Sequence, residues 1–258
     1  MILSRIIPTL LLSERGLYKT RRFGDPVYLG DPVNVINIYN EKQVDEIVVF
    51  DIDAHRTGQI DWDMLKQMAG ECFMPLCYGG GITTVDQIQT ILGLGIEKVS
   101  VNSAAYGDID FIRKAVAEAG SQSIAATIDY RRDATGTAMC YSHGGTRGQG
   151  ISVTDHARRL VDAGVGEIVI YDIDRDGMKT GYDLETIRKV TDAVDIPVVC
   201  CGGVRDVPDL REGLLAGASA CAAGSLFCFI GRLDAVLITY PNPEKLETEL
   251  RDAAVIVT

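Results

Sequence analysis

The chain contains the run Val44-Asp45-Glu46-Ile47-Val48-Val49-Phe50-Asp51-Ile52-Asp53, and 121 positions later it contains Val165-Gly166-Glu167-Ile168-Val169-Ile170-Tyr171-Asp172-Ile173-Asp174. Each run joins a stretch of consecutive apolar residues to a carboxylate. Continuous apolar stretches of this length are typical of strands that are buried on both faces of a parallel sheet. Because the run occurs twice, at a long interval, it predicts an internal repeat.

Further segments repeat at nearly the same interval. The run Pro75-Leu76-Cys77-Tyr78-Gly79-Gly80-Gly81 corresponds to Pro197-Val198-Val199-Cys200-Cys201-Gly202-Gly203, and Ser103 corresponds to Ser225. Segments that recur in the same order along a chain indicate a duplicated structural unit. We therefore expect two similar halves, each built as strand, helix, strand, helix.

Apolar runs alternate with amphipathic helical patterns along the whole chain. The length of 258 residues fits a (β/α)8 barrel, which has about 250 residues, whereas an open doubly wound sheet needs fewer strands. The sequence predicts a single-domain (β/α)8 TIM barrel over residues 1–258, with half-barrels at about 1–120 and 121–235 and a C-terminal helix at 236–258. The expected strands lie at about 5–11, 46–51, 75–79, 97–102, 123–129, 167–172, 197–201 and 220–224.

The composition disfavours several classes of partner. A net charge of −11 argues against nucleic acid and membrane surfaces, which attract basic faces. No run approaches the roughly 18 apolar residues of a membrane span, and Arg5 interrupts the short apolar stretch at the N-terminus, so we expect a cytoplasmic protein. The seven cysteines show no C-x-x-C spacing and are expected to be buried free thiols. No metal or cofactor is expected.

Glycines cluster where strands are expected to end. Gly79-Gly80-Gly81 and Gly202-Gly203 end the third and seventh strands, and Asn102-Ser103 and Gly224-Ser225 end the fourth and eighth. Glycine lets a backbone approach a ligand closely, and amides at the start of a helix attract anions. Because strand ends meet at the active-site mouth of a barrel, the pattern predicts two phosphate-binding loops across one mouth. Such a pair suits an elongated ligand with two phosphates.

Three carboxylates are also expected at strand ends facing the mouth, namely Asp51, Asp129 and Asp172. Each could act as a general acid or base or could cap the loop that follows it by hydrogen bonding, and the sequence leaves both roles open. Aligning residues 5–11 with residues 123–129 places Leu11 opposite Asp129. Leucine cannot exchange a proton, so a mechanism with two carboxylates across this mouth is excluded.

A set of short motifs matches one known family over almost the whole chain. The motifs are Arg5-Ile6-Ile7-Pro8, Gly30-Asp31-Pro32-Val33, Tyr78-Gly79-Gly80-Gly81-Ile82, Lys98-Val99-Ser100-Val101-Asn102-Ser103, Gly120-Ser121-Gln122, Ile128-Asp129, Asp174-Arg175-Asp176-Gly177 and Gly181-Tyr182-Asp183. With them the chain resembles the cyclase subunit of imidazole glycerol phosphate synthase, the HisF family. That family takes ammonia from a glutaminase partner, carries it through the barrel and adds it to a bisphosphorylated ribulosyl substrate in histidine biosynthesis.

The resemblance implies roles for residues at the mouth. It implies that Asp129 is one of two catalytic aspartates and that Lys19 contacts the substrate or an intermediate. We expect Asp51 to share in the catalytic chemistry, as a carboxylate at the same mouth. The resemblance assigns one phosphate to Gly81, Asn102 and Ser103, and the other to Asp176, Gly177, Gly203, Gly224 and Ser225.

Four charged residues fall at strand starts, at the opposite end of the barrel: Arg5, Glu46, Lys98 and Glu167. The resemblance implies that they form the charged gate through which ammonia enters. An alternative is a layer of salt bridges that closes the barrel floor, but burying four charges is costly and favours a functional reason. Glu97 matches an acidic contact to the partner, so the resemblance implies a HisH-like glutaminase on this N-terminal face.

The chain departs from the family at Leu11, where the second catalytic aspartate is expected. It reads Thr9-Leu10-Leu11 in place of Cys-Leu-Asp, and general acid–base help is worth about 10²–10⁴-fold. The loop at residues 51–55 also differs. Both departures resemble a divergent branch linked to bacterial surface sugars, including lipopolysaccharide O-antigen, whose members feed ammonia toward an acetamidino group on a nucleotide-linked sugar. We therefore expect an ammonia-dependent, lyase-type subunit of a glutamine amidotransferase complex with that task.

Three alternative functions remain open. An authentic histidine-pathway cyclase would need His55, Asp53 or Asp172 to replace the missing acid. The sister isomerase of that pathway also uses two strand-end aspartates, so Leu11 counts against it as well. A non-catalytic barrel that only activates a glutaminase is disfavoured by Asp129 and by the paired phosphate loops. Of the histidines, we expect only His55 near the mouth, and His143 and His156 at the surface.

Overall fold

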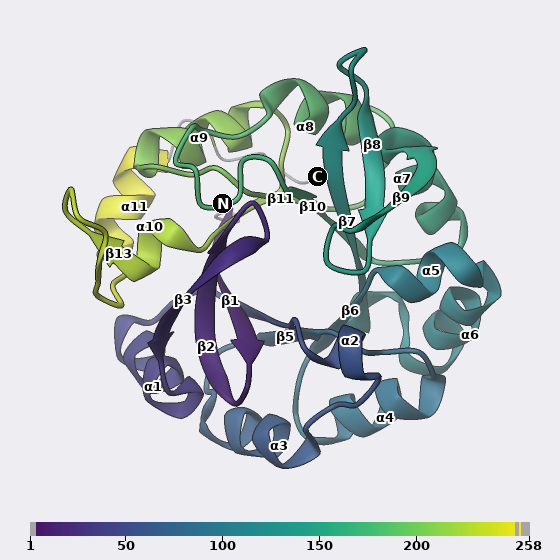
Figure 1. Cartoon of the computed structure of the whole chain (residues 1–258), viewed down its shortest axis with the longest axis horizontal. Coiled ribbons are helices and arrows are strands. Elements are labelled where there is room, and N and C mark those ends of the chain that lie inside the picture. The colour runs from purple at the N-terminus through teal and green to yellow at the C-terminus, as the bar shows by residue number, and fades with distance from the viewer. Residues whose placement is uncertain (1–3, 251–252, 254–258) are drawn as a thin grey trace.

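Eight parallel strands close into a ring in the computed structural model, which describes residues 4–250 and residue 253, apart from the side chain of His55 (Figure 1). Each strand pairs with the next, and β1 returns to pair with β12 through residues such as Arg5 and Ala220. The predicted (β/α)8 barrel is confirmed. Its strands are β1 (Arg5–Ser13), β4 (Ile47–Asp51), β5 (Leu76–Gly79), β6 (Lys98–Val101), β7 (Ile124–Arg132), β10 (Glu167–Asp172), β11 (Val198–Cys201) and β12 (Ala220–Ala223).

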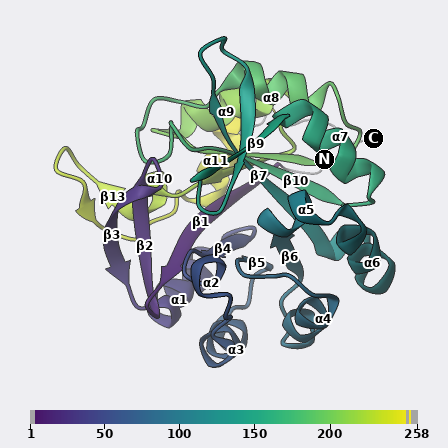
Figure 2. The same ribbon diagram turned by 45° about the vertical axis from the view of Figure 1, so that its right-hand side comes forward.

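Helices surround the strands on the outside in both views (Figures 1 and 2). Most begin at a polar side chain that accepts a hydrogen bond from a backbone N–H one turn later, as Asp31 does from Asn34 and Ser152 does from Asp155. Of the described helices, none is long and apolar enough to cross a membrane. The outer helices are α1 (Pro32–Lys42), α3 (Trp62–Glu71), α4 (Val85–Gly93), α6 (Ile109–Ala119), α7 (Val153–Asp162), α8 (Leu184–Thr191), α9 (Val207–Leu215) and α11 (Pro243–Leu250).

The C-terminal segment differs in part from the expectation. The sequence predicts a helix over residues 236–258, but α11 begins at Pro243, and residues 251–252 and 254–258 lie outside the described part. A short hairpin precedes it, made of β13 (Phe229–Ile230) and β14 (Ala235–Val236). The helix starts late because Pro241 and Pro243 favour a turn at this point, and the side chain of Asn242 accepts a hydrogen bond from Glu244 N.

Two barrel strands extend beyond the ring at the mouth. Strand β1 continues into the antiparallel strands β2 (Gly16–Arg21) and β3 (Gly24–Gly30), and β7 continues into β8 (Ala138–Ser142) and β9 (Arg147–Ser152). Figure 1 shows these two extensions on opposite sides of the barrel opening. They supply walls to the mouth that the sequence pattern did not indicate.

The strand register supports the alignment of the two halves. Leu11 on β1 lies beside Phe50 on β4, and Asp129 on β7 lies beside Tyr171 on β10. Phe50 and Tyr171 occupy the same position in the two copies of the repeated run. Leu11 therefore holds the place in the first half that Asp129 holds in the second. The boundaries of the half-barrels themselves stay a prediction.

The apolar core has two layers. The larger one lies between the strands and the outer helices, and a smaller one fills the inside of the barrel with Ile7, Val48, Val169, Val199 and their neighbours. The cysteines are free thiols, six of them buried and Cys72 half-buried. This agrees with the expectation of structural thiols that contribute to packing.

The tight packing of the glycine loop after β5 gives a first prediction. At Gly80 the backbone has φ of +132°, and a Cβ would lie 2.3 Å from the carbonyl oxygen of Asp51. We expect Gly80→Ala to lower the free energy of unfolding by about 2 kcal/mol or more, because the new methyl group must displace backbone. Urea denaturation measures this.

Gly93 is the matched control, because it lies in α4 without positive φ, and a methyl group added there would have no neighbouring atom within 4 Å. Gly93→Ala should leave the stability unchanged or raise it by roughly 0.5–1 kcal/mol. Equal effects of the two substitutions would show that the close contact at Gly80 does not constrain the fold.

Candidate active site

A cavity of about 480 Å³ lies at the end of the barrel where the strands finish. The strand ends of β1, β4, β5, β6, β7 and β10 contribute to it, together with the turn between β8 and β9. Apolar side chains make much of the wall, namely Leu11, Phe23, Phe50 and Tyr171. The cavity brings together five of the predicted site residues: Asp51, Gly81, Asn102, Ser103 and Asp129.

The first predicted phosphate loop lies in this cavity. Gly80 and Gly81 both adopt positive φ, and a Cβ at Gly81 would lie 2.8 Å from the Cβ of Ala54, so the loop packs closely on α2 (Ala54–Thr57). Asn102, at the end of β6, has a buried Oδ1 for which the described residues provide no hydrogen-bond partner. Such an atom at a cavity wall marks a place where a ligand or water completes the bond.

Among the described residues, Asp129 is one of two buried carboxylates that line the cavity, and Asp51 is the other. Oδ2 of Asp129 accepts a hydrogen bond of 2.7 Å from Nδ2 of Asn102. Burial raises the pKa of Asp129 to about 7; the hydrogen bond from Asn102 acts in the opposite direction, and the negative charge of Asp176 adds a smaller upward effect. A carboxyl group that titrates near neutral pH can both give and take a proton, as general acid–base chemistry requires.

Leu11 and Asp129 line the same cavity from β1 and β7. Leu11 is 4% exposed, so its side chain fills the place that corresponds to the Asp129 carboxylate. The cavity therefore has a proton-exchanging group on one side and an aliphatic surface on the other. This is the asymmetry that the sequence repeat predicted.

Asp51 and Asp172 both cap the loops that follow their strands. Asp51 accepts hydrogen bonds from the backbone N–H groups of Asp53 and Ala54 and from the hydroxyl of Tyr78. Asp172 accepts from the backbone of Asp174 and Arg175. Asp51 reaches the cavity wall, whereas Asp172 does not line it.

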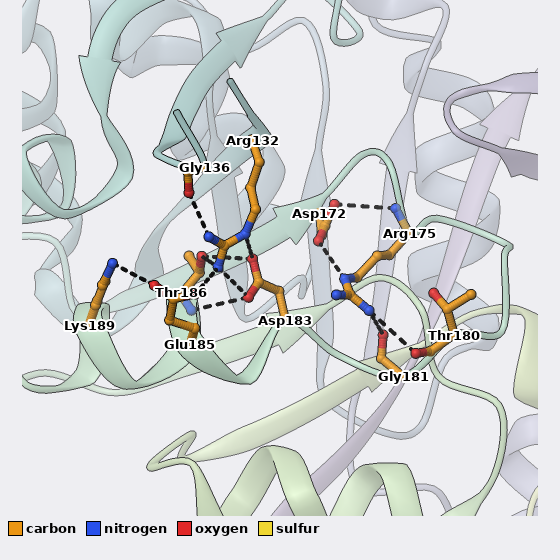
Figure 3. A network of polar contacts seen from close by, with 10 residues as sticks. All are labelled: Arg132, Gly136, Asp172, Arg175, Thr180, Gly181, Asp183, Glu185, Thr186 and Lys189. Carbon is orange, nitrogen blue, oxygen red and sulfur yellow. Dashed lines mark hydrogen bonds and ion pairs between the residues drawn. The ribbon is translucent and has the colours of Figure 1, made fainter. Parts of the chain in front are cut away.

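Asp172 also forms an ion pair that holds the loop after β10 (Figure 3). Its Oδ2 lies 3.2 Å from Nε of Arg175, and that guanidinium also donates to the carbonyl of Gly181. Burial, with the charge of Asp183 beside it, raises the pKa of Asp172 to about 6. Asp183 is itself held by Arg132 in a two-pronged ion pair. These residues fix the loop between β10 and α8.

The second predicted phosphate loop surrounds the side chain of Lys19. This residue lies on β2 and is 3% exposed. Its Nζ is 2.7 Å from Oδ1 of Asp176 and 3.1 Å from the hydroxyl of Tyr171. The remaining space is a small cavity of about 10 Å³, lined by the predicted residues Lys19, Asp176, Gly177, Gly203, Gly224 and Ser225. The predicted residues thus come together, with the lysine among them.

The four charged residues at the strand starts form a closed ring. Arg5 pairs with Glu46 and with Glu167. The ammonium of Lys98 lies 3.2 Å from a carboxylate oxygen of each of the same two glutamates. Cations and anions alternate, so each charge has two partners of opposite sign, and Glu97 next to Lys98 is exposed. The ring lies at the floor of the barrel, at the opposite end from the cavity.

The expectation of a surface position was wrong for His156; His143 is exposed as expected, but it lies at the mouth. His143 lines the cavity, because the turn between β8 and β9 folds over the mouth, and its backbone N–H donates to Oγ of Ser103. His156 is buried and stacks on Tyr106, with ring centroids 4.1 Å apart. Burial lowers the pKa of His156 to about 4, and the charge of Arg159 contributes. The side chain of His55 lies outside the described residues.

Sequence reasoning also missed Tyr171 as a site residue. It lies in the second copy of the repeated run, one position before Asp172, and the alternation of a strand points it into the barrel where Asp172 points away. Asp53, a proposed replacement acid, accepts hydrogen bonds from Ser13 and Glu14 instead of lining the cavity. It ties the β1–β2 turn to the loop after β4.

The raised pKa of Asp129 predicts a pH-dependent stability. From its ordinary value of 3.8 up to about 7, the unfolded chain loses the proton while the folded chain keeps it, so folding becomes less favourable as the pH rises through this window. Asp129→Asn carries no such proton. The free energy of unfolding of Asp129→Asn should exceed that of the parent. This difference should increase by a few kcal/mol between pH 5 and pH 8, because one pKa unit corresponds to about 1.4 kcal/mol.

Thermal unfolding at the two pH values measures the effect. Asp133→Asn is the control, because hydrogen bonds from Thr135 and its neighbours lower the pKa of the Asp133 carboxyl, and no such gain is expected there. A difference between Asp129→Asn and the parent that is the same at pH 5 and pH 8 would contradict the burial of a titrating carboxyl group.

Comparison with known proteins identifies the family. Residues 5–233 match the family described as "Histidine biosynthesis protein". A relative from Pseudomonas aeruginosa, provisionally named imidazole glycerol phosphate synthase subunit hisF2, is 46% identical over 96% of this chain and 99% of its own length. A provisionally named hisF3 subunit from Vibrio vulnificus is 41% identical over 97% of each chain.

A third relative carries the name without qualification. The imidazole glycerol phosphate synthase subunit HisF of Alkaliphilus metalliredigens is 40% identical over 88% of this chain and 91% of its own length. A match to the family over most of the chain, together with relatives of this identity and coverage, shows the family to which the chain belongs. The chain is a HisF-like member of the histidine biosynthesis protein family.

Proposed function

We propose that this chain receives ammonia from a HisH-like glutaminase and transfers it to a phosphorylated substrate during synthesis of an acetamidino sugar of a bacterial surface polysaccharide. In this role it is an ammonia-dependent, lyase-type subunit of a glutamine amidotransferase complex. The observation that carries the proposal is Leu11. It places an aliphatic side chain opposite Asp129, where the ordinary cyclase of the resembling family uses a second aspartate.

The other carboxylates near the mouth do not offer a replacement. Asp172 is paired with Arg175 and does not line the cavity, and Asp53 is bonded to Ser13 and Glu14. Asp51 reaches the wall, but its oxygens already accept three hydrogen bonds. A chemistry that uses Asp129, with Asp51 at the wall in a supporting role, therefore fits the cavity better than one that uses two carboxylates on opposite sides of the mouth.

The floor of the barrel supports the part of the proposal that concerns ammonia. The ring of Arg5, Glu46, Lys98 and Glu167 keeps four charges together at the N-terminal face. A purely structural plug would gain as much from apolar residues of similar size, because the desolvation of the two buried glutamates and the half-buried cations offsets much of their attraction. The exposed Glu97 beside the ring offers a contact for the glutaminase.

The alternative is an authentic cyclase of histidine biosynthesis. The Alkaliphilus relative bears the name of that enzyme's HisF subunit, and this observation favours the alternative. His143, which lines the cavity beside Ser103, is the group that such an enzyme could use in place of the missing acid. A non-catalytic barrel that only activates a glutaminase fits poorly, since it would have no use for a buried carboxyl group with a pKa near neutrality.

The first test separates the two enzymatic functions. We expect the purified chain, supplied with ammonium salt, to turn over the histidine-pathway bisphosphate no faster than background, because general acid–base help is missing at Leu11. Leu11→Asp should raise this rate by roughly 10²-fold, as measured by formation of the cyclised product. Leu11→Asn is the matched control, having the same size without the titrating proton. Robust cyclisation by the unmodified chain would refute the proposal in favour of the histidine enzyme.

The second test concerns the glutaminase and its docking face. Glu97→Arg reverses a charge beside the floor ring, so we expect the dissociation constant of the complex with a HisH-type glutaminase to rise roughly tenfold, as typically follows when one charge contact at an interface is reversed. Isothermal titration calorimetry measures it.

The control for that experiment is Asp86→Arg, which makes the same change in the exposed first turn of α4, at the mouth end of the barrel. It should leave the dissociation constant within about twofold of the parent value, because reversing a charge outside an interface changes affinity little. If Asp86→Arg weakens the complex and Glu97→Arg does not, the glutaminase binds the mouth face, and the floor ring is not its entrance.

A further inference from the structure

The turn between β8 and β9 is anchored on two sides of the mouth. The backbone N–H of His143 donates a hydrogen bond of 3.1 Å to Oγ of Ser103, in the first predicted phosphate loop. Two residues later, a Cβ added to Gly145 would lie 3.0 Å from Ile173 and 3.2 Å from Phe23, so the backbone packs closely on both side chains. These contacts hold the turn in one position at the rim of the barrel opening (Figure 1).

His143 has a backbone conformation that glycine adopts more easily. Its φ is +54°, and the next two residues, Gly144 and Gly145, have φ of +63° and +75°. A left-handed backbone costs a residue with a side chain more free energy than it costs glycine. The turn nevertheless has a histidine at the position whose backbone bonds to Ser103. Backbone strain of this kind is typical of positions where the side chain has a functional role.

A chain of hydrogen bonds orients the imidazole ring of His143. Its Nδ1 lies 2.7 Å from Oγ of Ser142, and the same Oγ accepts a hydrogen bond of 2.6 Å from Nε2 of Gln149. That amide nitrogen also donates to the carbonyl of Arg147, which fixes the orientation of the amide. Ser142 is 0% exposed, so its hydroxyl hydrogen needs an acceptor within the protein. Since Gln149 donates, we infer that Nδ1 of His143 accepts this hydrogen.

The tautomer determines what the ring offers to a ligand. In a neutral imidazole one nitrogen carries the hydrogen and the other accepts a hydrogen bond. Because Nδ1 accepts from Ser142, Nε2 carries the hydrogen, and it is the nitrogen available to the cavity that His143 lines. A nitrogen that already carries a hydrogen donates hydrogen bonds and does not take up a proton. His143 is thus suited to ligand binding, and this counts against its use as a base by a histidine-pathway enzyme.

We propose that His143 is a specificity-determining residue that donates a hydrogen bond from Nε2 to a phosphate oxygen of the ligand at the loop of Gly81, Asn102 and Ser103. The backbone bond between His143 and Ser103 holds the imidazole beside this loop. Ser103 accepts in that bond, so its own hydroxyl hydrogen can donate to the ligand. One phosphate group is then bound from two directions, by the loop and by the turn. The inference rests on the proposed phosphorylated substrate.

Nuclear magnetic resonance of the imidazole nitrogens tests the tautomer. The chain has three histidines, and the variant His143→Asn identifies the signals of His143 by their loss. At about pH 8.5, well above the ordinary histidine pKa of about 6.5, we expect Nδ1 to give the resonance of an unprotonated nitrogen and Nε2 that of a nitrogen with a hydrogen. The opposite assignment would overturn the inference, because Nε2 could then not donate.

Inorganic phosphate is the probe for binding, and the shifts of backbone amide resonances report each loop separately. The amides of Gly81 and Ser103 report the first loop, and the amide of Gly203 reports the second. We expect added phosphate to shift the resonances of the first loop together with that of Nε2 of His143. A shift of Gly81 and Ser103 without any change at His143 would overturn the inference and leave the proposed phosphorylated substrate intact.

Two substitutions separate the hydrogen-bond donor from the shape of the turn. The amide nitrogen of glutamine reaches about as far as Nε2 of histidine, whereas that of asparagine reaches about as far as Nδ1. Asparagine adopts positive φ more readily. We expect His143→Gln to keep the dissociation constant of phosphate at the first loop within about threefold of the parent value. His143→Asn should raise it roughly tenfold, through loss of one hydrogen bond to a charged group. The opposite order would show that the residue only shapes the turn and would overturn the inference.

The second loop is the internal control. Neither substitution should change the dissociation constant of phosphate at Gly203 by more than about twofold, because distant sites respond independently. Equal weakening at both loops would indicate a general loss of structure and would contradict a local donor. If neither substitution alters binding at the first loop, the inference fails alone. If phosphate leaves Gly81 and Ser103 of the parent unshifted, the first loop is not an anion site, and the proposed phosphorylated substrate fails with the inference.

Discussion

The pairing of β1 with β12 is the constraint on which the rest of the molecule depends. These strands are more than 200 residues apart in the chain, and their hydrogen bonds convert a sheet into a closed ring. Closure brings Arg5 within reach of Glu46 and Glu167 at one end and places Leu11 and Asp129 around one cavity at the other. An open sheet would keep the same strand-end residues in a line, and neither the ring nor the mouth would exist.

Features that depend on strand alternation and on the repeat could be predicted from the sequence. The two-residue period of a strand and the closure of the barrel predict the eight strands. They also predict that Leu11 occupies the position equivalent to Asp129 and that the four charged residues at the strand starts form a ring. Features that depend on how connections fold could not. Lys19 was expected as a contact for substrate, and only the antiparallel path of β2 reveals that it points into the loop around Gly224. His143 likewise reaches the cavity because β8 and β9 bend over it.

Two sets of paired charges show how the barrel accommodates ions at its ends: the cations at the floor are half-buried, and the pair near the mouth is buried. At the floor, alternating signs give every charge two opposite neighbours. Near the mouth, Lys19 and Asp176 form a single pair, and the carboxylate needs Thr20, Tyr171 and the backbone of Phe23 to complete its hydrogen bonds. Asp129 has one donor, Asn102, and burial raises its pKa toward neutrality. Asp129, which has a single hydrogen-bond donor among the described residues, is therefore a buried carboxyl group that remains available for proton exchange.

The extension of β1 into β2 and β3 carries a consequence for how the molecule meets other chains. The ring itself presents no free strand edge, but within the described part of the chain β3 pairs only with β2, so its outer side leaves backbone groups unpaired. Such a side invites a foreign strand to add to the sheet. Pro26 removes one N–H from β3, and Asp25 adds a charge beside it. Both features discourage the pairing of another chain with β3, so β2 and β3 can shape the mouth without promoting association through their edge.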